Sequence, residues 1–322
     1  MGRWIAGRLA QAIVTAAVAS VLVFFLMRAA PGDPLARLSE DRQLTADQAA
    51  VLRERYGLDA PLATQFAAFI GGLLRGDLGT SIEHGRPVTA LLGERLPASL
   101  LLGGTVLFFT FGLGAWLGAV QAIRRGAFDR ALGAASLVLY ATPSFWLALV
   151  LAWLVGVEWR LLPAAGMRDP FLPGDAGAGE RLADIARHLV LPALTLAAVN
   201  IGATMRYQRA AMLEALEQPY IGAARVRGLD DHRVHWRHAW RNALFPVVTL
   251  FGLWLPLLVA GSVFVEKIFA WPGLGALAAD AVAARDYPLL MGASLLVTGL
   301  VIVGSLLADL AYTALDPRVR RP

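Results

Sequence analysis

The sequence predicts an all-α protein that crosses a membrane several times, and three observations support this fold class. Hydrophobic residues fill 57% of 322 positions and charged residues only 16%, whereas soluble domains carry about 25% charged residues. Several apolar stretches approach or exceed the roughly 20 residues that a helix needs to cross a bilayer. Arginines gather at the ends of these stretches, as topology signals do. This distribution favours membrane lipids over nucleic acid as the partner of the basic residues.

Six spans are predicted, and together they account for most of the chain. The first apolar run is longer than the roughly 7–15 residues of a signal-peptide core, and no clear A-x-A site follows, so we expect a retained anchor. The fourth span is the shortest. The predicted spans cover residues 9–27, 98–123, 131–157, 189–205, 243–265 and 288–308.

The arginines predict the orientation of the spans. Lysine and arginine prefer the cytoplasmic side of short loops. Four basic regions fall on one side when six spans are threaded in order, so both termini are expected in the cytoplasm. These regions are Arg3 with Arg8, Arg124 with Arg125 and Arg130, the segment 219–246, and Arg318 with Arg320 and Arg321.

The connections between the spans predict the domain organisation. The segment 31–97 is long and mixed in charge, and Thr45 with Gln48 resembles a helix capping box, so a small folded domain is expected outside the membrane. We expect an N-terminal span at 1–30, this outer domain at 31–97, a core of five spans at 98–314 with a loop at about 212–242, and a tail at 315–322.

Several kinds of chemistry are disfavoured by the residues present. Cysteine is absent, which excludes disulfides and thiolate metal sites. The only lysine, Lys267, lies in "VEKIFA" and not in a G-x-x-x-x-G-K-[ST] loop, so ATP is not bound by that route. An ion-coupled transporter should carry charged midplane sites in repeated halves, and a membrane hydrolase needs a nucleophile with a base at membrane depth. Neither pattern is visible, and the "GTS" at 79–81 has no obvious histidine partner.

The basic segment 219–246 predicts two consecutive helices. Pro219 suits a first helical position and Gly228 the position just past a helix end, so they bracket a helix of about two turns. Asp230 and Asp231 can cap a second helix. In that helix tryptophans and arginines recur every four residues on adjacent faces, which is typical of a helix at lipid headgroups. Pro246 is expected to kink or start the fifth span.

Several motifs in order along nearly the whole chain resemble one family. They include "TPSFWLAL", "EQPYIGAARVRGLDDHRVHWRHAWRNALFPVVT", "VFVEKIFAWPGLG" and "RDYPLL". The chain resembles the permease subunits of ATP-binding-cassette (ABC) importers of the dipeptide, oligopeptide and nickel type. The resemblance implies the type I permease fold, no catalytic residue, and no cofactor in this chain, because ATP and magnesium bind to partner subunits.

The resemblance also implies that the loop between the fourth and fifth spans docks on a separate ATPase subunit. Gly222, Ala223, Ala224 and Gly228 match the E-A-A-x-x-x-G pattern of such loops, except that the acidic residue is missing. Glu217 lies nearby and its compensating role is open. The candidate coupling residues are Glu217, Tyr220, Gly222, Ala223, Ala224, Arg225 and Gly228, supported by Asn242 and Pro246.

The partners that the resemblance implies are a second permease, two ATPase subunits, a soluble substrate-binding protein and membrane lipids, in a bacterial inner membrane. The cargo is expected to be a di- or oligopeptide, with nickel or glutathione as alternatives. The outer mouth that receives the binding protein is expected at Trp271, Pro272, Gly273 and Gly275, although Trp271 could simply be an interfacial anchor.

Other residues keep two interpretations. Asn200 in the fourth span is either a pathway residue or an interhelical hydrogen-bonding group, whereas Arg206 is better explained as a topology anchor. His232, His235 and His238 are more typical of an exposed helix surface than of a metal site, because no carboxylate or thiol completes a ligand set. Gly114 and Gly118 form a G-x-x-x-G, which predicts close packing within the bundle or against a second permease.

Overall fold

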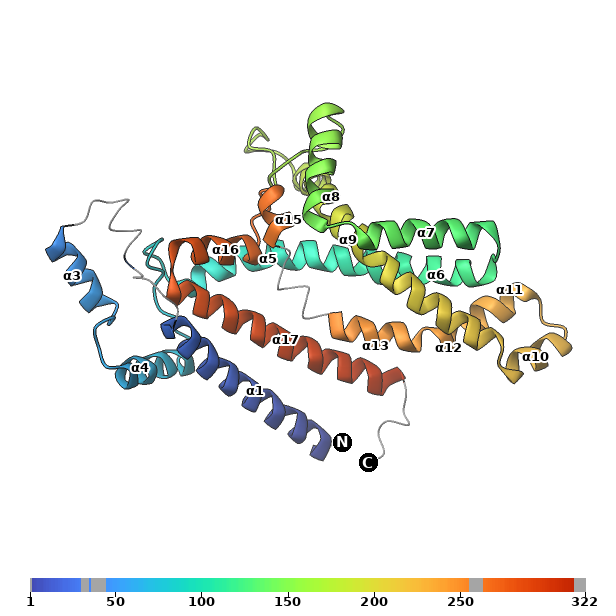
Figure 1. Ribbon diagram of the computed structural model, residues 1–322, viewed down its shortest axis with the longest axis horizontal. Helices are drawn as coiled ribbons and strands as arrows, with labels where there is room; N and C mark the ends of the chain where they lie inside the picture. Colours follow the sequence, from blue (N-terminus) through green and yellow to red (C-terminus); the bar gives the residue numbers. More distant parts are fainter. Residues whose placement is uncertain (1, 30–34, 36–44, 255–262, 316–322) are drawn as a thin grey trace. The chain divides into compact units, whose positions relative to one another are not determined.

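The computed structural model describes residues 2–29, 35, 45–254 and 263–315, and most of these residues are helical (Figure 1). Within that part of the chain the β-structure is limited to one isolated bridge between Thr80 and Pro87. Two compact units can be separated. The first contains Met1–Ser99 and Pro272–Val303, and the second Leu100–Trp271 and Gly304–Pro322.

The first unit is built on α1 (Gly2–Ala29), α3 (Ala46–Arg55), α4 (Leu62–Leu74), the start of α5 (Val88–Leu107), α16 (Leu274–Ala284) and most of α17 (Tyr287–Leu315). The predicted capping box of α3 is confirmed, because the Thr45 side chain accepts from the Gln48 amide and the Gln48 side chain accepts from the Thr45 amide. Phenylalanines join α1 to α4. The centroid of the Phe24 ring lies 5.2 Å from that of Phe66 and 5.5 Å from that of Phe69.

A buried aspartate joins the loop before α5 to the start of α17. Asp286 is fully buried and accepts hydrogen bonds from the Ser81 hydroxyl, the Glu83 amide and the Leu289 amide. His84 lies with its Nδ1 atom 3.1 Å from Ser81 Oγ, so the expectation that "GTS" lacks a histidine partner is wrong. The group has no nucleophile available to substrate, since Ser81 is itself buried and donates to Asp286.

The second unit contains the remaining helices, and two predicted spans differ from expectation. The third span is a bent pair: α7 (Ala127–Ala141) and the following helix Ser144–Glu158 meet at 99°. Thr142 precedes Pro143 and is extended, because a proline ring disfavours helical geometry in the residue before it. The predicted single helix at 131–157 is therefore wrong.

The fourth span is part of a much longer helix than predicted. α9 runs from Ala178 to Leu216, 39 residues, and passes through Pro192 without a break. The predicted fifth span is described only as α13 (Phe245–Trp254) and α15 (Val263–Ile268), since residues 255–262 lie outside the described part. Four helices, or five if the bent pair counts as one span, are long and apolar enough to cross a membrane among the described residues.

Close packing against α9 explains the G-x-x-x-G motif. The second span is continuous from Val88 to Ile123 through α5, η1 (Phe108–Leu113) and α6 (Gly114–Ile123). A Cβ built on Gly118 would lie 2.4 Å from the Met205 carbonyl oxygen, and one on Gly114 would lie 3.1 Å from Ile201. The motif therefore packs within this chain, and the predicted alternative of packing within the bundle is confirmed.

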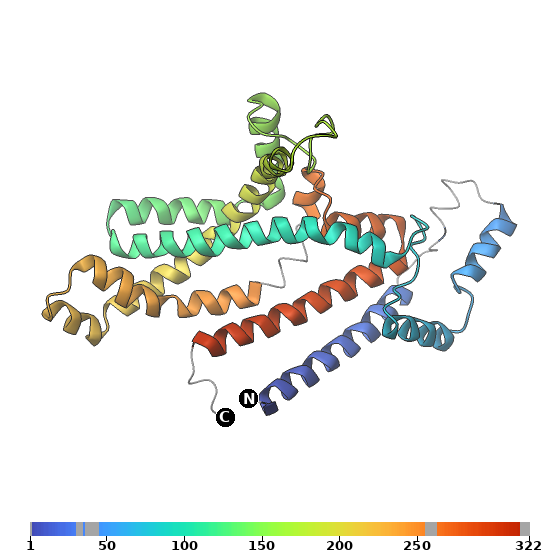
Figure 2. The ribbon, with the colours of Figure 1, turned by 180° about the vertical axis from the view of Figure 1, so that it is seen from behind.

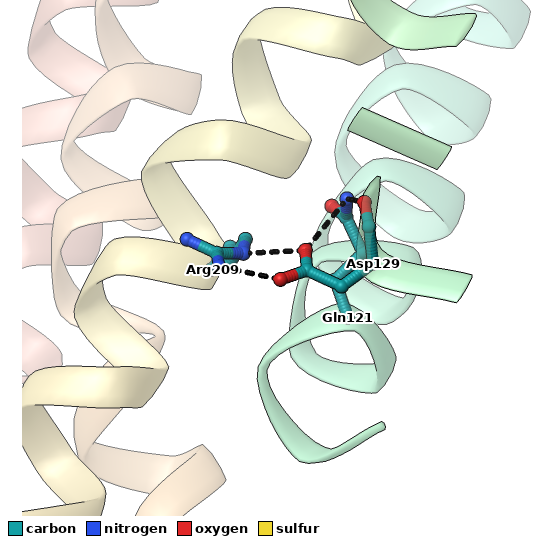
Figure 3. Close-up of polar contacts among 3 residues, drawn as sticks. All are labelled: Gln121, Asp129 and Arg209. Carbon is teal, nitrogen blue, oxygen red and sulfur yellow. Dashed lines mark hydrogen bonds and ion pairs between the residues drawn. The ribbon is translucent and has the colours of Figure 1, made fainter. Parts of the chain in front are cut away.

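An ion pair joins α7 to the C-terminal half of α9 (Figure 3). Arg209 Nε and Nη2 donate to the two carboxylate oxygens of Asp129 at 2.7 and 2.6 Å. The buried Gln121 of α6 donates to the same carboxylate at 3.3 Å and to the Asp129 carbonyl at 3.1 Å. Three helices thus meet at one carboxylate, near the point where α9 leads into the basic loop.

Candidate functional site: the basic loop between α9 and α13

The basic loop, residues 217–244, begins with a short helix whose ends are set by proline and glycine. α10 spans Pro219–Val226, with proline at its first position and Gln218 as N-cap. Gly228 has φ of +78°, the left-handed geometry that ends helices and that glycine adopts without steric cost. The Leu229 amide then donates back to the Ala224 carbonyl at 3.3 Å. The predicted two-turn helix is present, one residue shorter than its expected extent.

A hydrophobic cluster holds α10 in place, which a helix of this length requires. Ile221 is fully buried and Ala224 is 7% exposed. They pack with residues from both flanking helices and from α6. The buried members of this cluster are Ala119, Ala122, Met212, Ala215, Ile221, Ala224, Val234, Ala239 and Ala243. The loop therefore has its own small core, attached directly to α9 and α6.

The opposite face of α10 is exposed and consists of small, apolar and basic residues. Gly222, Ala223 and Arg225 are exposed, and a Cβ added to Gly222 would meet nothing within 4 Å. Val226, which the sequence did not single out, is 90% exposed. Ala224 points the other way, into the cluster, so it supports this face from within and does not form part of it. Glu217 is exposed at the C-cap of α9.

The second predicted helix is present in three short pieces, α11 (Asp231–Arg233), η3 (Val234–Ala239) and α12 (Trp240–Ala243). Asp230 caps it as predicted, with its side chain accepting from the Arg233 amide at 2.8 Å. The three arginines spaced four apart, Arg233, Arg237 and Arg241, are exposed.

The two tryptophans of that helix differ from expectation. Trp236 and Trp240 are half-buried, with ring centroids 5.3 Å apart, and pack on the cluster beneath α10. Trp240 also contacts a second cluster of Leu107, Phe111, Ala115 and Val247. Their predicted headgroup face is therefore largely occupied by the protein's own core.

Both predicted support residues occupy defined places. The Asn242 side-chain amide donates to the Tyr220 hydroxyl at 2.9 Å and to the His238 carbonyl at 3.1 Å. This joins the start of α10 to the end of the loop. Pro246 is the second residue of α13, so it starts that helix and does not kink it.

The histidines of the loop are not grouped for metal binding. Among the described residues, no three His, Cys, Asp or Glu side chains lie together closely enough to hold a metal ion. Burial lowers the pKa of His235 below its ordinary value of 6.5; Asp231 opposes this shift, whereas Arg225 and His232 add to it. The surroundings of His235 therefore disfavour its protonated form.

The residues predicted at the outer mouth form a buried turn. The Trp271 side chain is fully buried, and its amide donates to the Glu266 carbonyl at 2.8 Å. Burial is incompatible with the interfacial-anchor alternative for this tryptophan. Gly273 caps α16, and Gly273 and Gly275 are also buried, whereas Pro272 is half-buried.

The side chain of the predicted pathway residue, Asn200, forms its hydrogen bond within its own helix. Asn200 is half-buried, and its side-chain amide donates to the Leu196 carbonyl at 2.7 Å. Arg206 is exposed and lies over the Tyr140 ring, 4.8 Å from its centroid.

Comparison with known proteins identifies the family of the chain that carries this loop. The family described as the binding-protein-dependent transport system inner membrane component matches residues 110–321, and its N-terminal counterpart matches residues 1–103. The chain belongs to this permease family.

Individual relatives of the permease match over almost their whole lengths. The oligopeptide transport system permease protein AppB of Bacillus subtilis is 37% identical over 302 residues, covering 93% of each chain. The dipeptide transport system permease protein DppB of Escherichia coli K12 is 35% identical over 336 residues and 99% of each chain. The di/tripeptide transport system permease protein DppB of Pseudomonas aeruginosa is 36% identical over 98% of each.

Proposed function

We propose that this permease is the membrane subunit of an ABC importer for di- and oligopeptides. The observation that supports it most directly is the basic loop, whose α10 rests on its own core and exposes Gly222 and Ala223. A partner can approach such a small-residue surface closely. The cargo is inferred from the three relatives described above, which are an oligopeptide, a dipeptide and a di/tripeptide permease.

The partners follow from the family. A second permease completes the translocation path, and a soluble binding protein delivers peptide. Two ATPase subunits bind ATP and magnesium and hydrolyse ATP, so this chain is a transport subunit and not an enzyme. One ATPase docks on the exposed face of α10, with Gly222, Ala223, Arg225 and Val226 in contact and Glu217 and Tyr220 at its edge.

The geometry of the second unit suggests how movement would travel from that dock. Ile221 and Ala224 pack in the same cluster as Met212 and Ala215 of α9. α9 is continuous for 39 residues, and Arg209 binds Asp129 of α7. Force on α10 would therefore move α9, α6 and α7 together, a rigid-body motion of the kind that switches transporters between two packed states.

We further propose six spans in a bacterial inner membrane, with both termini in the cytoplasm. The basic loop then faces the ATPases, and the segment 31–97 faces the binding protein with the turn at 271–275. The four-part division at 1–30, 31–97, 98–314 and 315–322 remains part of this proposal, as does a pathway role for Asn200.

Other assignments predict different behaviour. A nickel or glutathione importer would share this loop and these kinds of partners, but it would not take up ordinary di- and oligopeptides. An ion-coupled transporter would take up substrate without ATP, driven by a gradient.

The test is uptake of radiolabelled trialanine into proteoliposomes that contain the purified complex, with binding protein outside and ATP inside. We expect uptake that requires ATP and is abolished by replacing Ala223 with Trp, with loss of the ATPase subunits from the purified complex. Uptake driven by an ion gradient without ATP would contradict the proposal, and uptake of nickel or glutathione in place of peptide would contradict the cargo.

A further inference from the structure

A pocket with both polar and apolar walls lies within the first unit. Its volume is about 440 Å³, within the range of roughly 300–1,000 Å³ that is usual for small-molecule sites. It is lined by the end of α1, the end of α3, much of α4, the segment 77–80 and the start of α17. None of the functions above uses it.

Two arginines line the pocket and have no ion-pair partner among the residues that the structure describes. They are Arg28 at the end of α1 and Arg55 at the end of α3. The Nε atom of Arg28 is buried and has no hydrogen-bond acceptor in the described part of the chain. Its guanidinium lies over the Phe24 ring, 5.7 Å from the centroid, which holds it in place. A buried donor on a cation is costly unless an anion binds there.

Three other arginines of the same unit have partners outside the pocket. Arg53 pairs with Asp59 at 3.7 Å, Arg86 pairs with Glu94, and Arg75 donates to the Gly71 carbonyl at 2.9 Å. The buried Arg28 Nε atom, from which no described group accepts, and Arg55 in the same pocket together point to an exogenous anion there. A carboxylate suits two guanidinium groups, which donate in a planar fork.

The pocket also carries unused acceptors. The Gln65 amide nitrogen donates to the Leu58 and Ala60 carbonyls at 3.1 and 2.7 Å. Its Oε1 atom is buried and has no partner among the residues described. Asp77 contributes a carboxylate, of which Oδ1 accepts from the Gly79 amide at 2.8 Å. These groups call for a donor, such as an ammonium group. A phosphatidylglycerol headgroup would satisfy the arginines, but it carries no ammonium group, whereas a free amino terminus supplies that donor.

Apolar side chains complete the lining. Ala68 and Phe69 of α4, Leu78 of the following segment, and Pro288 and Met291 of α17 supply nonspecific contact area. A site with a cationic part, an acceptor part and apolar walls fits a zwitterionic peptide, which has oppositely charged ends and variable side chains.

We propose that this pocket binds a short peptide through its ends, with the C-terminal carboxylate at Arg28 and Arg55 and the amino terminus at Asp77 and Gln65. The inference rests on the proposed function and extends it, because it gives the permease a peptide subsite of its own. Recognition of the ends and not of the side chains would let one site accept many sequences.

The test measures equilibrium binding of radiolabelled trialanine, and of trialanine amide, to the complex of permeases and ATPases in nanodiscs before binding protein is added. We expect the double variant Arg28→Gln/Arg55→Gln to weaken trialanine binding at least tenfold. The unmodified complex should bind trialanine amide as weakly as the double variant binds trialanine. Arg75→Gln is the matched control, since Arg75 is an exposed arginine outside the pocket, and it should leave binding unchanged.

The remaining outcomes separate this inference from the proposed function. Retention of the ATPase subunits by the double variant shows that the complex is intact. If position 28 carries Lys in place of Gln, the positive charge is kept, and part of the trialanine affinity should return. The pocket assignment would be overturned if trialanine and trialanine amide bound equally well, or if the double variant bound trialanine as the unmodified complex does. It would also be overturned if the double variant lost a bound anionic phospholipid and kept its affinity for trialanine. Those results leave the importer standing if ATP-driven peptide uptake persists, whereas absence of that uptake in the unmodified complex contradicts the importer itself.

Discussion

Arg209 and Asp129, 80 positions apart in sequence, form a two-pronged ion pair at 2.7 and 2.6 Å that joins α9 to α7. Asp129 lies just after the turn between α6 and α7, and Arg209 lies two turns before the end of α9. The pair therefore connects these two helices at the end of α9 that leads to α10. Among the described residues, no other ion pair joins these two helices.

Replacing Asp129 with Asn should destabilise the complex and weaken coupling. The substitution leaves Arg209 partly buried without its anion, at a cost of about 1–2 kcal/mol, at the low end for charged hydrogen bonds because Arg209 is 36% exposed. We expect a lower unfolding temperature, and peptide uptake that falls more than ATP hydrolysis does. The double variant Asp129→Asn/Arg209→Gln should cost less than the sum of the single variants in a double-mutant cycle. Additive costs would show that the two side chains act independently.

Gly118 should tolerate no larger residue. A Cβ at this position would lie 2.4 Å from the Met205 carbonyl oxygen and 2.9 Å from Gln208 Cβ, so Gly118→Ala must push α6 away from α9. Overpacking of this kind costs about 1–3 kcal/mol. Thermal unfolding of the purified complex provides the measurement, with Gly104→Ala in the same span as the control because its Cβ meets nothing within 4 Å. Equal stability of the two variants would contradict the packing.

Gly228 should be required for its backbone geometry. At φ of +78° an alanine costs about 1–2 kcal/mol, although the space around its Cβ is open. Gly228→Ala should loosen the end of α10 and increase proteolysis of the loop, whereas Gly222→Ala, in a helical position with open space, should not. Similar cleavage of the two variants would show that the left-handed turn does not hold the loop.

His235 should make the loop less stable in mild acid. Burial lowers its pKa below 6.5 in the folded loop, so the unfolded loop takes up a proton first as the pH falls. Stability is therefore unaffected above about pH 6.5, the ordinary histidine value, and falls as the pH drops from there towards the lowered pKa. Hydrogen exchange of residues 219–243 at pH 7.5 and 5.5 measures this, and His235→Gln should reduce the difference. The same pH response in that variant would assign it to another group.

The sequence predicts the existence of α10 well because proline and glycine at its ends act locally. It does not predict which face points inward. Ala224 and Ala223 are the same residue type, and apolar Val226 is 90% exposed while Ile221 is buried. Only the positions of α6, α9 and η3 around the helix distinguish them.

Longer-range features explain the other differences. The break at Thr142 has a local signal in the following proline, but a hydropathy pattern over 131–157 conceals it. α9 extends beyond its apolar part because its polar ends, such as Glu180 and Gln208, also favour helix. The Arg209–Asp129 pair has no sequence signal, since neither residue indicates its partner.

Cross-linking is the best test of the proposed contact between the exposed face of α10 and an ATPase subunit. The chain contains no cysteine, so single cysteines at 223 and 224 give an unambiguous comparison between the exposed and buried faces. In native membranes treated with a short thiol-to-amine cross-linker, Ala223→Cys should join the permease to an ATPase subunit, and Ala224→Cys should not. Absence of a cross-link from position 223, or equal cross-linking from both positions, would contradict the account.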